Sequence, residues 1–345
     1  MTAAIGAVGT AFPPPVDQQE SWDGFFSTHY GGSRAAARIW RNAGVRRRHA
    51  AVNPCTEDIS GDGTAARMSR FVDEAMPLGK EAVEGCLARV GLDAGDVDLF
   101  TVVSCTGYAT PGVDILLARD LGMPSSVQRL QIGHMGCYAA LPGLAAVSDA
   151  AVARGKTGVL LCLELPSLHL QGPTAELDQI VAHALFSDAA AAVAVVPGGP
   201  GLEIVDVVAA TEPATAGYMT WEVTDHGFRM RLSSRVPSVL DENVGALVDE
   251  LLGGHDLRVA DVDHWAIHPG GPRIISTIAR RLGLPDEAVA ASTSVLRDHG
   301  NCSSATVLLV LDELVRTREP TPGDHVVAMA FGPGLTLYAA LLRAR

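Results

Sequence analysis

DVDLFTVVSCTG at residues 96–107 and DVDHWAIHPGG at residues 261–271 are two versions of one pattern that begin 165 residues apart. Each version opens on Asp-Val-Asp and continues into a short apolar run, which is typical of a buried β-strand. Each is then followed by a glycine-led segment with helical character, at residues 136–155 and 300–316. The repeat predicts a duplicated α/β unit in which two strand ends and two helix starts meet around a pseudo-two-fold axis.

Three residues with chemically useful side chains occupy matched places in this repeat. Cys137 lies 41 residues after the first Asp of its copy, and Asn301 lies 40 residues after the first Asp of the other. His268 ends the second apolar run. The duplication therefore predicts that Cys137, His268 and Asn301 converge, and they are the candidate catalytic residues.

The rest of the chain repeats the order of strand, helix and strand. Helical spacing over residues 67–92 and 236–257 precedes the two apolar runs described above. Further apolar runs without alternation, at 157–164 and 325–332, indicate strands buried on both faces of a sheet covered by helices.

A Pro/Gly cluster at residues 197–201 is the expected junction between the two copies. We therefore expect an N-terminal half, residues 1–198, that carries the cysteine, and a C-terminal half, residues 199–345, that carries the histidine and asparagine. Residues 207–235 follow no clear pattern, although they are too apolar for a plain linker.

The composition narrows the class of protein. Hydrophobic residues make up 48% of the 345 residues and charged residues 19%, as in a buried, sheet-rich globular enzyme. A net charge of −13 argues against nucleic-acid binding, which needs a basic face. No apolar stretch approaches the length of about 18 residues that a membrane span needs. The six cysteines show neither CxxC pairs nor zinc-ligand spacing, so we expect no metal site and a reducing cytoplasm as the location.

Cys137 stands at the head of a helical segment that is apolar nearly all round. A helix N-terminus presents unpaired N–H groups and the positive end of the helix dipole, which lower the pKa of a thiol and favour the nucleophilic thiolate. The alternative is that Cys137 is simply a small buried hydrophobic residue. The matched histidine and asparagine favour the nucleophile.

His268 and Asn301 each have a catalytic and a structural interpretation. His268 precedes a rigid Pro-Gly-Gly-Pro turn, and it could hold a thiolate or donate to an oxyanion, or it could be a hydrogen-bonded core histidine. Asn301 begins a helix, where it could be an N-cap or supply a second oxyanion donor through its amide. The turn at Gly332–Gly334 could form the floor of the same pocket.

The order Cys, His, Asn also occurs in papain-like proteases, which we considered and set aside. The Cys-Gly-Ser-Cys-Trp signature of that family is absent around Cys137, and its nucleophile sits near the mature N-terminus. A duplicated chain has no place in that fold.

Five ordered motifs resemble the type III polyketide synthases, the chalcone-synthase-like branch of the thiolase superfamily. The resemblance runs from about residue 30 to the end of the chain. A β-ketoacyl-carrier-protein synthase III shares the Cys, His and Asn pattern, but HPGGP and FGPG favour the polyketide synthase branch. The motifs are GHMGCYAALPGL (133–144), ALFSDAAAAV (184–193), WAIHPGGP (265–272), HGNCSSATVLLVLDEL (299–314) and AFGPGLTL (330–337).

The resemblance implies a homodimer of duplicated thiolase folds, each with five layers in the order α-β-α-β-α, and a buried site reached through a pantetheine tunnel. Cys137 would carry a starter acyl group, while His268 and Asn301 would form the oxyanion hole. Malonyl thioester would lose CO₂ and extend the starter. The substrates would be coenzyme A or carrier-protein phosphopantetheine thioesters, malonyl-CoA among them, with no permanently bound cofactor.

The resemblance also implies a set of binding residues. Trp221 occupies the position of a family glycine that tunes the elongation cavity, which predicts one or two extensions, or acyl transfer without chain extension. His169 replaces a small threonine, Met230 replaces a phenylalanine, and Thr110 replaces a methionine that reaches into the partner subunit. The substrate-binding set is Phe186, Met230, Trp221, His169, Cys105, Thr106 and Ser303, and the set for coenzyme A is Arg38, Gly270 and Arg273, with Arg34, Arg41 and Arg46–Arg48 nearby.

Overall fold

The structure is a computed structural model that describes residues 2–345. Its centre is a mixed sheet of nine strands in the order β11-β12-β13-β8-β1-β7-β6-β4-β5. The first half of the chain contributes β1 (Ala3–Ala11), β4 (Leu99–Ser104), β5 (Gln128–Gly133), β6 (Gly158–Glu164) and β7 (Ala189–Pro197). The second half contributes β8 (Leu202–Thr211), β11 (His264–Ile267), β12 (His325–Gly332) and β13 (Thr336–Ala344).

The two halves of the sheet repeat one another outward from their junction. On one side the order runs β1, β7, β6, β4, and on the other it runs β8, β13, β12, β11. The halves meet where β1 and β8 pair in antiparallel fashion at Ala4↔Glu203 and Ile5↔Leu202. The duplication read from the sequence is therefore present as a pseudo-symmetric pair of strand sets.

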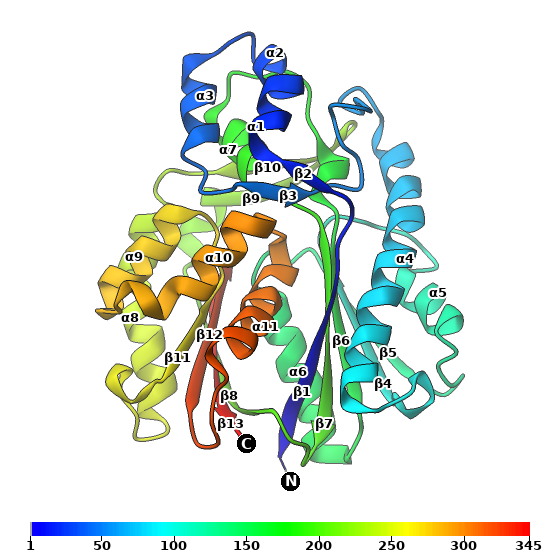
Figure 1. Cartoon of the computed structure of the whole chain (residues 1–345), viewed down its shortest axis with the longest axis vertical. Coiled ribbons are helices and arrows are strands. Elements are labelled where there is room, and N and C mark those ends of the chain that lie inside the picture. The colour runs from blue at the N-terminus through cyan, green and yellow to red at the C-terminus, as the bar shows by residue number, and fades with distance from the viewer. Residues whose placement is uncertain (1) are drawn as a thin grey trace.

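Helices complete the five layers of the duplicated thiolase fold (Figure 1). The central layer holds α6 (Ala140–Arg154) and α11 (Thr306–Arg318), whose apolar side chains share one core with strands of both halves. A second core lies under the outer helices. The outer helices are α4 (Thr64–Val90) and α5 (Val113–Asp120) on one side, and α8 (Val236–Gly253) and α9 (Pro272–Leu282) on the other. Helix α10 (Ala290–His299) comes before the central helix α11 in the chain.

The expected helices and buried strands are present. The segment 67–92 lies within α4 and the loop after it, and the helix ends at Gly91 because that residue adopts the left-handed conformation with φ 68°. The segment 236–257 forms α8, which ends earlier, at Gly253. Every residue of β6 is buried, as its unbroken apolar run predicts. No helix in the described part of the chain is long and apolar enough to cross a membrane.

The segment without a clear sequence pattern, 207–235, forms the end of β8 and a hairpin. The hairpin consists of β9 (Met219–Thr224) and β10 (Gly227–Leu232), and it lies with several short elements at one end of the main sheet (Figure 1). This group covers the candidate site residues described below. The other members are β2 (Pro15–Asp17), α1 (Gln18–Ser21), α2 (Ser27–His29), α3 (Arg34–Arg41), β3 (Arg47–His49), the 3₁₀ turn η3 (Pro166–His169) and α7 (Leu177–Leu185).

Candidate active site

Cys137, His268 and Asn301 line one cavity of about 560 Å³, which we call the entrance cavity. Cys137 lies in the turn between β5 and α6, and His268 directly follows β11. Asn301 lies between α10 and the 3₁₀ turn η7 (Ser303–Ala305) that leads into α11. Residues from both halves of the repeat therefore meet around one cavity, as their matched positions predict.

His268 is held by its backbone and is almost fully buried. Its N–H donates to the carbonyl oxygen of Met329 at 2.8 Å, and its side chain has a buried Nδ1 without a hydrogen-bond partner. Burial lowers the pKa of His268 to about 3, so the imidazole is neutral when the site is empty. A Cβ placed on Gly270 would lie 3.8 Å from Nε2 of His268, which is an ordinary contact distance and places Gly270 directly beside this edge of the ring.

The amide oxygen of Asn301 is bound within the protein, which orients the side chain. Its Oδ1 accepts the backbone N–H of Ser303 at 2.9 Å, just ahead of η7, whose N-terminal cap is Cys302. This bond occupies the acceptor end of the amide, so the NH₂ group is the end available to a ligand. The backbone of Asn301 is fixed as well, because its N–H donates to the carbonyl of Leu185 at 2.8 Å.

The prediction that the helix N-terminus lowers the pKa of the Cys137 thiol is wrong. Burial raises the pKa of the thiol to about 12, although the side chains of Ser303 and Asn301 act in the opposite direction. The helix itself begins only at Ala140, so Cys137 precedes its first turn. The resting group is a thiol, and its reaction therefore requires a base to accept the proton.

A buried carboxyl group lies behind these residues, and sequence reasoning missed it. The carboxyl of Glu164 accepts hydrogen bonds from Ser304 Oγ at 2.5 Å, Thr106 Oγ1 at 2.8 Å and the backbone N–H of Cys105 at 3.0 Å. Burial raises its pKa. The signal was present in the sequence, because Glu164 is the only charged residue in the buried strand GVLLCLE.

A second space, of about 30 Å³, lies next to Cys137, and we call it the inner chamber. Phe186 and Met230 line both the inner chamber and the entrance cavity. Trp221 lines the inner chamber but not the entrance cavity, and its Nε1 donates to the carbonyl of Cys105 at 2.7 Å. The remaining predicted residues that line the inner chamber are Cys105, Thr106 and Ser303.

The predicted floor of the site is also in place. Pro333 lines the inner chamber together with Cys137. A Cβ placed on Gly136 would come within 2.5 Å of the Pro333 ring, and Gly136 has a φ of 84°. The turn at Gly332–Gly334 therefore packs directly against the residue that precedes the thiol, which only a glycine permits.

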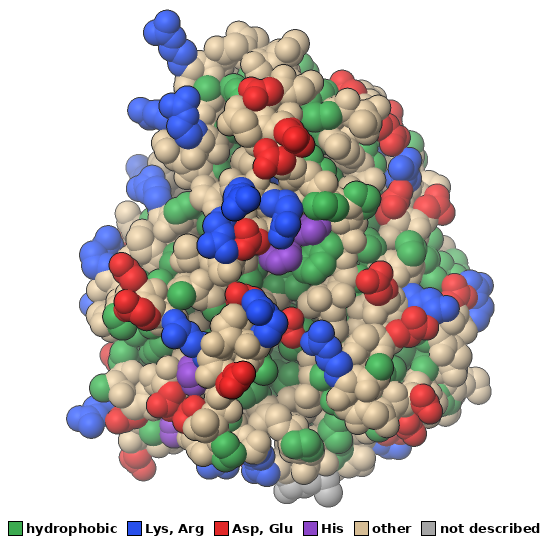
Figure 2. All heavy atoms as spheres, viewed as in Figure 1, with side chains coloured by type: hydrophobic (Ala, Val, Ile, Leu, Met, Phe, Trp, Pro, Cys, Tyr) green, Lys and Arg blue, Asp and Glu red, His purple; other side chains and the backbone are tan. Residues whose placement is uncertain are grey.

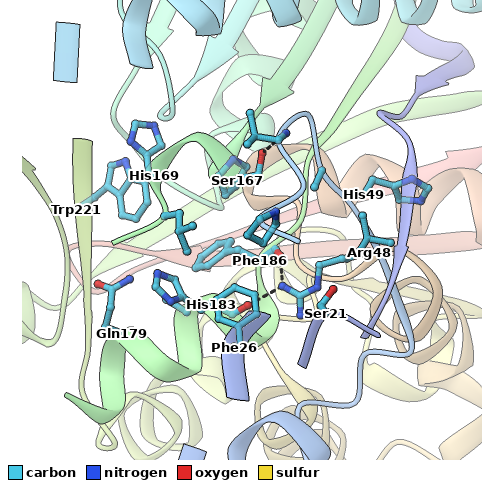
Figure 3. Close-up of a pocket in the computed structure, with 17 residues that line it drawn as sticks. Ser21, Phe26, Arg48, His49, Ser167, His169, Gln179, His183, Phe186 and Trp221 are labelled. Atoms are coloured by element: carbon cyan, nitrogen blue, oxygen red, sulfur yellow. Dashed lines mark hydrogen bonds between the residues drawn. The ribbon is translucent and has the colours of Figure 1, made fainter. Parts of the chain in front are cut away.

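His169 is not in the predicted place. It lines a third space of about 60 Å³, the side cavity, which shares Phe186, Trp221 and Pro166 with the inner chamber. Figure 3 shows this cavity, with His169 and Trp221 next to each other in its wall. Both ring nitrogens are bonded to backbone groups of Thr106 and Phe228, so neither nitrogen is left to bind a substrate.

The residues expected to bind coenzyme A lie together in the structure. Arg38, Gly270 and Arg273 all line the entrance cavity. In Figure 2 basic side chains gather over α3, and the sequence has no acidic residue between Asp23 and Glu57. A chain of net charge −13 thus presents a locally basic rim, which suits a phosphorylated ligand.

Arg48 differs from the arginines around it and does not belong to this rim. It is buried, and its guanidinium donates to the carbonyl oxygen of Ala184 at 2.7 Å and to that of Phe186 at 3.0 Å; Figure 3 shows the bond to Phe186. Its place near Arg46 and Arg47 in the sequence suggested the entrance. In the structure Arg48 instead binds backbone carbonyls of the segment that carries Phe186.

Comparisons with known proteins identify the family of this chain. Residues 1–200 match the N-terminal domain of chalcone and stilbene synthases, and residues 203–345 match the C-terminal domain. A 1,3,6,8-tetrahydroxynaphthalene synthase of Streptomyces peucetius subsp. caesius is 35% identical, over 99% of this chain and 93% of that protein. A 3,5-dihydroxyphenylacetyl-CoA synthase of Streptomyces toyocaensis is 31% identical, over 99% of this chain and 94% of that protein.

Solved structures give the same result. The 1,3,6,8-tetrahydroxynaphthalene synthase of Streptomyces coelicolor A3(2), a bacterial type III polyketide synthase, superimposes with a TM-score of 0.93 at 27% identity, over 100% of this chain and 99% of that one. PKS-I of the brown alga Ectocarpus siliculosus gives a TM-score of 0.92 at 29% identity, over 100% and 98%. The chain belongs to the chalcone and stilbene synthase family, the type III polyketide synthases, which are acyltransferases that condense a starter acyl-CoA with malonyl-CoA.

Proposed function

We propose that Cys137 carries the starter acyl group and that His268 and Asn301 serve both loading and condensation. The observation that carries this proposal is the convergence of the three side chains where the entrance cavity meets the inner chamber. In the loading step the Cys137 sulfur attacks the thioester carbonyl while the neutral His268 takes the thiol proton. The proton then leaves with the coenzyme A thiolate.

The neutral state of His268 supports its role as this base. A thiol with a pKa of about 12 cannot supply enough thiolate by itself near neutral pH. An imidazole whose pKa is about 3 is unprotonated at pH 7, so it has a nitrogen that can receive the proton, and the negative charge that forms on the sulfur strengthens this otherwise weak base. The charge that develops on the thioester oxygen is stabilised by the Asn301 NH₂ group, whose orientation is set by the bond from Ser303.

In the condensation step malonyl-CoA binds in the emptied entrance cavity and loses CO₂. Asn301 and His268, with its proton on Nε2, donate hydrogen bonds to the enolate oxygen. The enolate carbon attacks the Cys137 thioester, a carbon–carbon bond forms, and the Cys137 thiolate leaves. Asn301 is a donor in both steps because the oxyanion and the enolate oxygen carry similar charge at similar places, whereas His268 accepts a proton in loading and donates a hydrogen bond in condensation.

The size of the inner chamber supports a short product. A space of about 30 Å³ leaves room for about one water molecule. Trp221 limits this space, and its bond to the carbonyl of Cys105 directs the indole toward Cys137 rather than into the apolar cores. We therefore propose one or two extensions, with coenzyme A as the usual donor and a carrier-protein thioester as the alternative.

We further propose that the protein is a cytoplasmic homodimer. Each subunit consists of two halves, residues 1–198 and 199–345. β5 is the outer strand of its half of the sheet, and five of its six residues are exposed. A sheet edge of this kind is suited to pairing with a second copy. Thr110, which replaces a family methionine that reaches into the partner subunit, is exposed. A cytoplasmic location is proposed because a reducing compartment suits a nucleophilic thiol.

Labelled malonyl-CoA with a panel of acyl-CoA starters tests the reaction. Release of CO₂ together with a new carbon–carbon bond supports condensation. Transfer of the acyl group to an acceptor without CO₂ release would instead indicate a ketosynthase-III-like acyltransferase, which the comparisons do not favour. Failure to form an acyl-enzyme from coenzyme A or carrier-protein thioesters would point to a non-catalytic partner protein.

A further inference from the structure

The inner wall of the chamber beside Cys137 is supplied by the β9–β10 hairpin. Trp221 and Met230 are paired directly opposite each other on its two strands, and both line the inner chamber. A hairpin of two short strands is not stable by itself. The position of the Trp221 indole therefore depends on what holds the hairpin in place.

His169 makes one of these attachments, and its two hydrogen bonds define its tautomer. Nε2 lies 2.6 Å from the carbonyl oxygen of Thr106, and since a carbonyl only accepts, Nε2 carries the proton. Nδ1 is then the acceptor for the backbone N–H of Phe228 at 2.9 Å. The neutral ring thus joins the loop after β4 to the second strand of the hairpin.

The same ring packs against the aromatic side chains of the hairpin. It stacks on Phe228 with a centroid separation of 4.3 Å and an interplanar angle of 12°. It also meets the Trp221 indole edge to face at 5.4 Å and 77°. Trp221 donates to Cys105, the residue before Thr106, so histidine and indole attach the hairpin to adjacent positions of one loop.

Other attachments hold β10, where Arg229 pairs with Glu176 and the N–H of Leu232 donates to Asp178 at 3.3 Å, and the tip of the hairpin. Thr64, at the start of α4, accepts the N–H of Gly227 at 2.8 Å, and Gln171 donates to the carbonyls of His226 and Phe228 at 3.0 and 3.1 Å. The hydrogen bond of His169 reaches the same part of β10, at Phe228. His169 differs from these polar anchors because its ring also packs against the Trp221 indole.

We propose that His169 is a positioning residue that fixes Trp221 at the inner end of the chamber and thereby limits the number of malonyl extensions. This inference rests on the proposed condensation. His169 has no free nitrogen for substrate, so it acts through the indole rather than on the acyl chain. Burial lowers its pKa to about 4, and the charge of Arg67 acts in the same direction, so the neutral ring persists at pH 7.

The test compares His169→Phe and His169→Gln with the parent enzyme, each labelled with 5-fluorotryptophan. Phenylalanine keeps the stacking but loses both hydrogen bonds, while glutamine can keep only the bond to Thr106. We expect a product at least one extension longer from His169→Phe, a smaller change from His169→Gln, and acylation of Cys137 within about two-fold of the parent. The ¹⁹F resonance of Trp221, assigned among the four tryptophans with Trp221→Phe, should shift and broaden.

Glu203→Gln is the control that shows whether a loss of folding stability alone changes the products. Glu203 is buried at the far end of the sheet, where it pairs with Arg343 and Arg345. This variant should melt earlier while its products and Trp221 resonance stay unchanged. Folded His169 variants with the parent's products and resonance would overturn the proposal, as would the same product shift in Glu203→Gln.

A measurement on the parent protein tests the attachment of His169 to Thr106 and Phe228 even where the variants do not fold. Two-dimensional ¹H–¹⁵N correlation spectra of the histidine rings should show His169 as the Nε2–H tautomer, with no protonation from pH 8 down to pH 5.5. An Nδ1–H tautomer, or titration near pH 6.5, would refute the attachment. If the parent makes no carbon–carbon bond from malonyl-CoA, the proposed function fails, while the tautomer and the Trp221 resonance still test the attachment.

Discussion

Replacing Trp221 with glycine should join two spaces that the indole now separates. The inner chamber holds about 30 Å³ and the side cavity about 60 Å³, and Trp221 lines both. Removing an indole vacates on the order of 150 Å³, since large aromatic side chains bury roughly 150–250 Å² each. The chamber beside Cys137 would therefore grow several-fold. We expect Trp221→Gly to add at least one extension or to accept a larger starter.

The same substitution carries a cost in stability that can be estimated. At about 24 cal/mol per Å³ of residual cavity, ~150 Å³ corresponds to about 3–4 kcal/mol, and the lost bond to the Cys105 carbonyl adds about 1 kcal/mol. The cavity figure is an upper value because Trp221 is only partly buried and water can enter. A fall in Tm of roughly 5–10 °C is expected for a chain of this size.

Mass spectra of the products, intact-mass measurement of the acyl-enzyme and a thermal melt together check this prediction. Acylation of Cys137 should proceed as in the parent. A folded variant with an unchanged product spectrum would refute the claim that Trp221 limits the chamber. A variant that unfolds near room temperature would instead assign Trp221 to structural packing with Phe228, its T-shaped neighbour at 6.0 Å.

Other predictions concern the catalytic residues and pH. Asn301→Ala should still form the acyl-enzyme but release CO₂ from malonyl-CoA on the order of 10²–10³ times more slowly, because one oxyanion donor is lost; an unchanged rate would leave Asn301 with only a structural role. His268→Gln should load Cys137 slowly at pH 7 and faster at pH 9–10, where hydroxide ionises the thiol, and a loading rate that does not depend on pH would contradict its role as the base. His169 and His268 have folded-state pKa values of about 4 and 3, lowered by burial below the unfolded value of about 6.5. The unfolded state therefore binds more protons below pH 6.5, so the urea midpoint should fall as pH decreases from 6.5 toward 4, and a midpoint that rises would contradict their neutral burial.

The fold could be predicted from the sequence because its strongest signal is internal. A repeated strand and helix start, offset by a constant number of residues, indicates pseudo-symmetry without knowledge of any contact. The unbroken apolar run at 157–164 was likewise sufficient to predict β6. The hairpin at 219–232 could not be predicted, because its apolar residues face a small cavity and a ring stack rather than one side of a sheet.

The convergence of Cys137, His268 and Asn301 also followed from the repeat, whereas their protonation states did not. The expected effect of the helix N-terminus is opposed by burial, and the depth of Cys137 is set by segments far away in the sequence. The inward bond of Trp221 and the backbone bonds of His169 depend on the place of one loop carbonyl and one strand N–H. Contacts of this kind have no local sequence pattern.

The central claim is that a Claisen condensation takes place on Cys137. Its most direct test is peptide-mapped mass spectrometry of the enzyme after a starter acyl-CoA is added, followed by malonyl-CoA. We predict one acyl adduct on the peptide that contains Cys137, its absence in Cys137→Ala, and its consumption with CO₂ release when malonyl-CoA is added. An adduct on Cys105, or one on Cys137 that malonyl-CoA leaves untouched, would contradict the account.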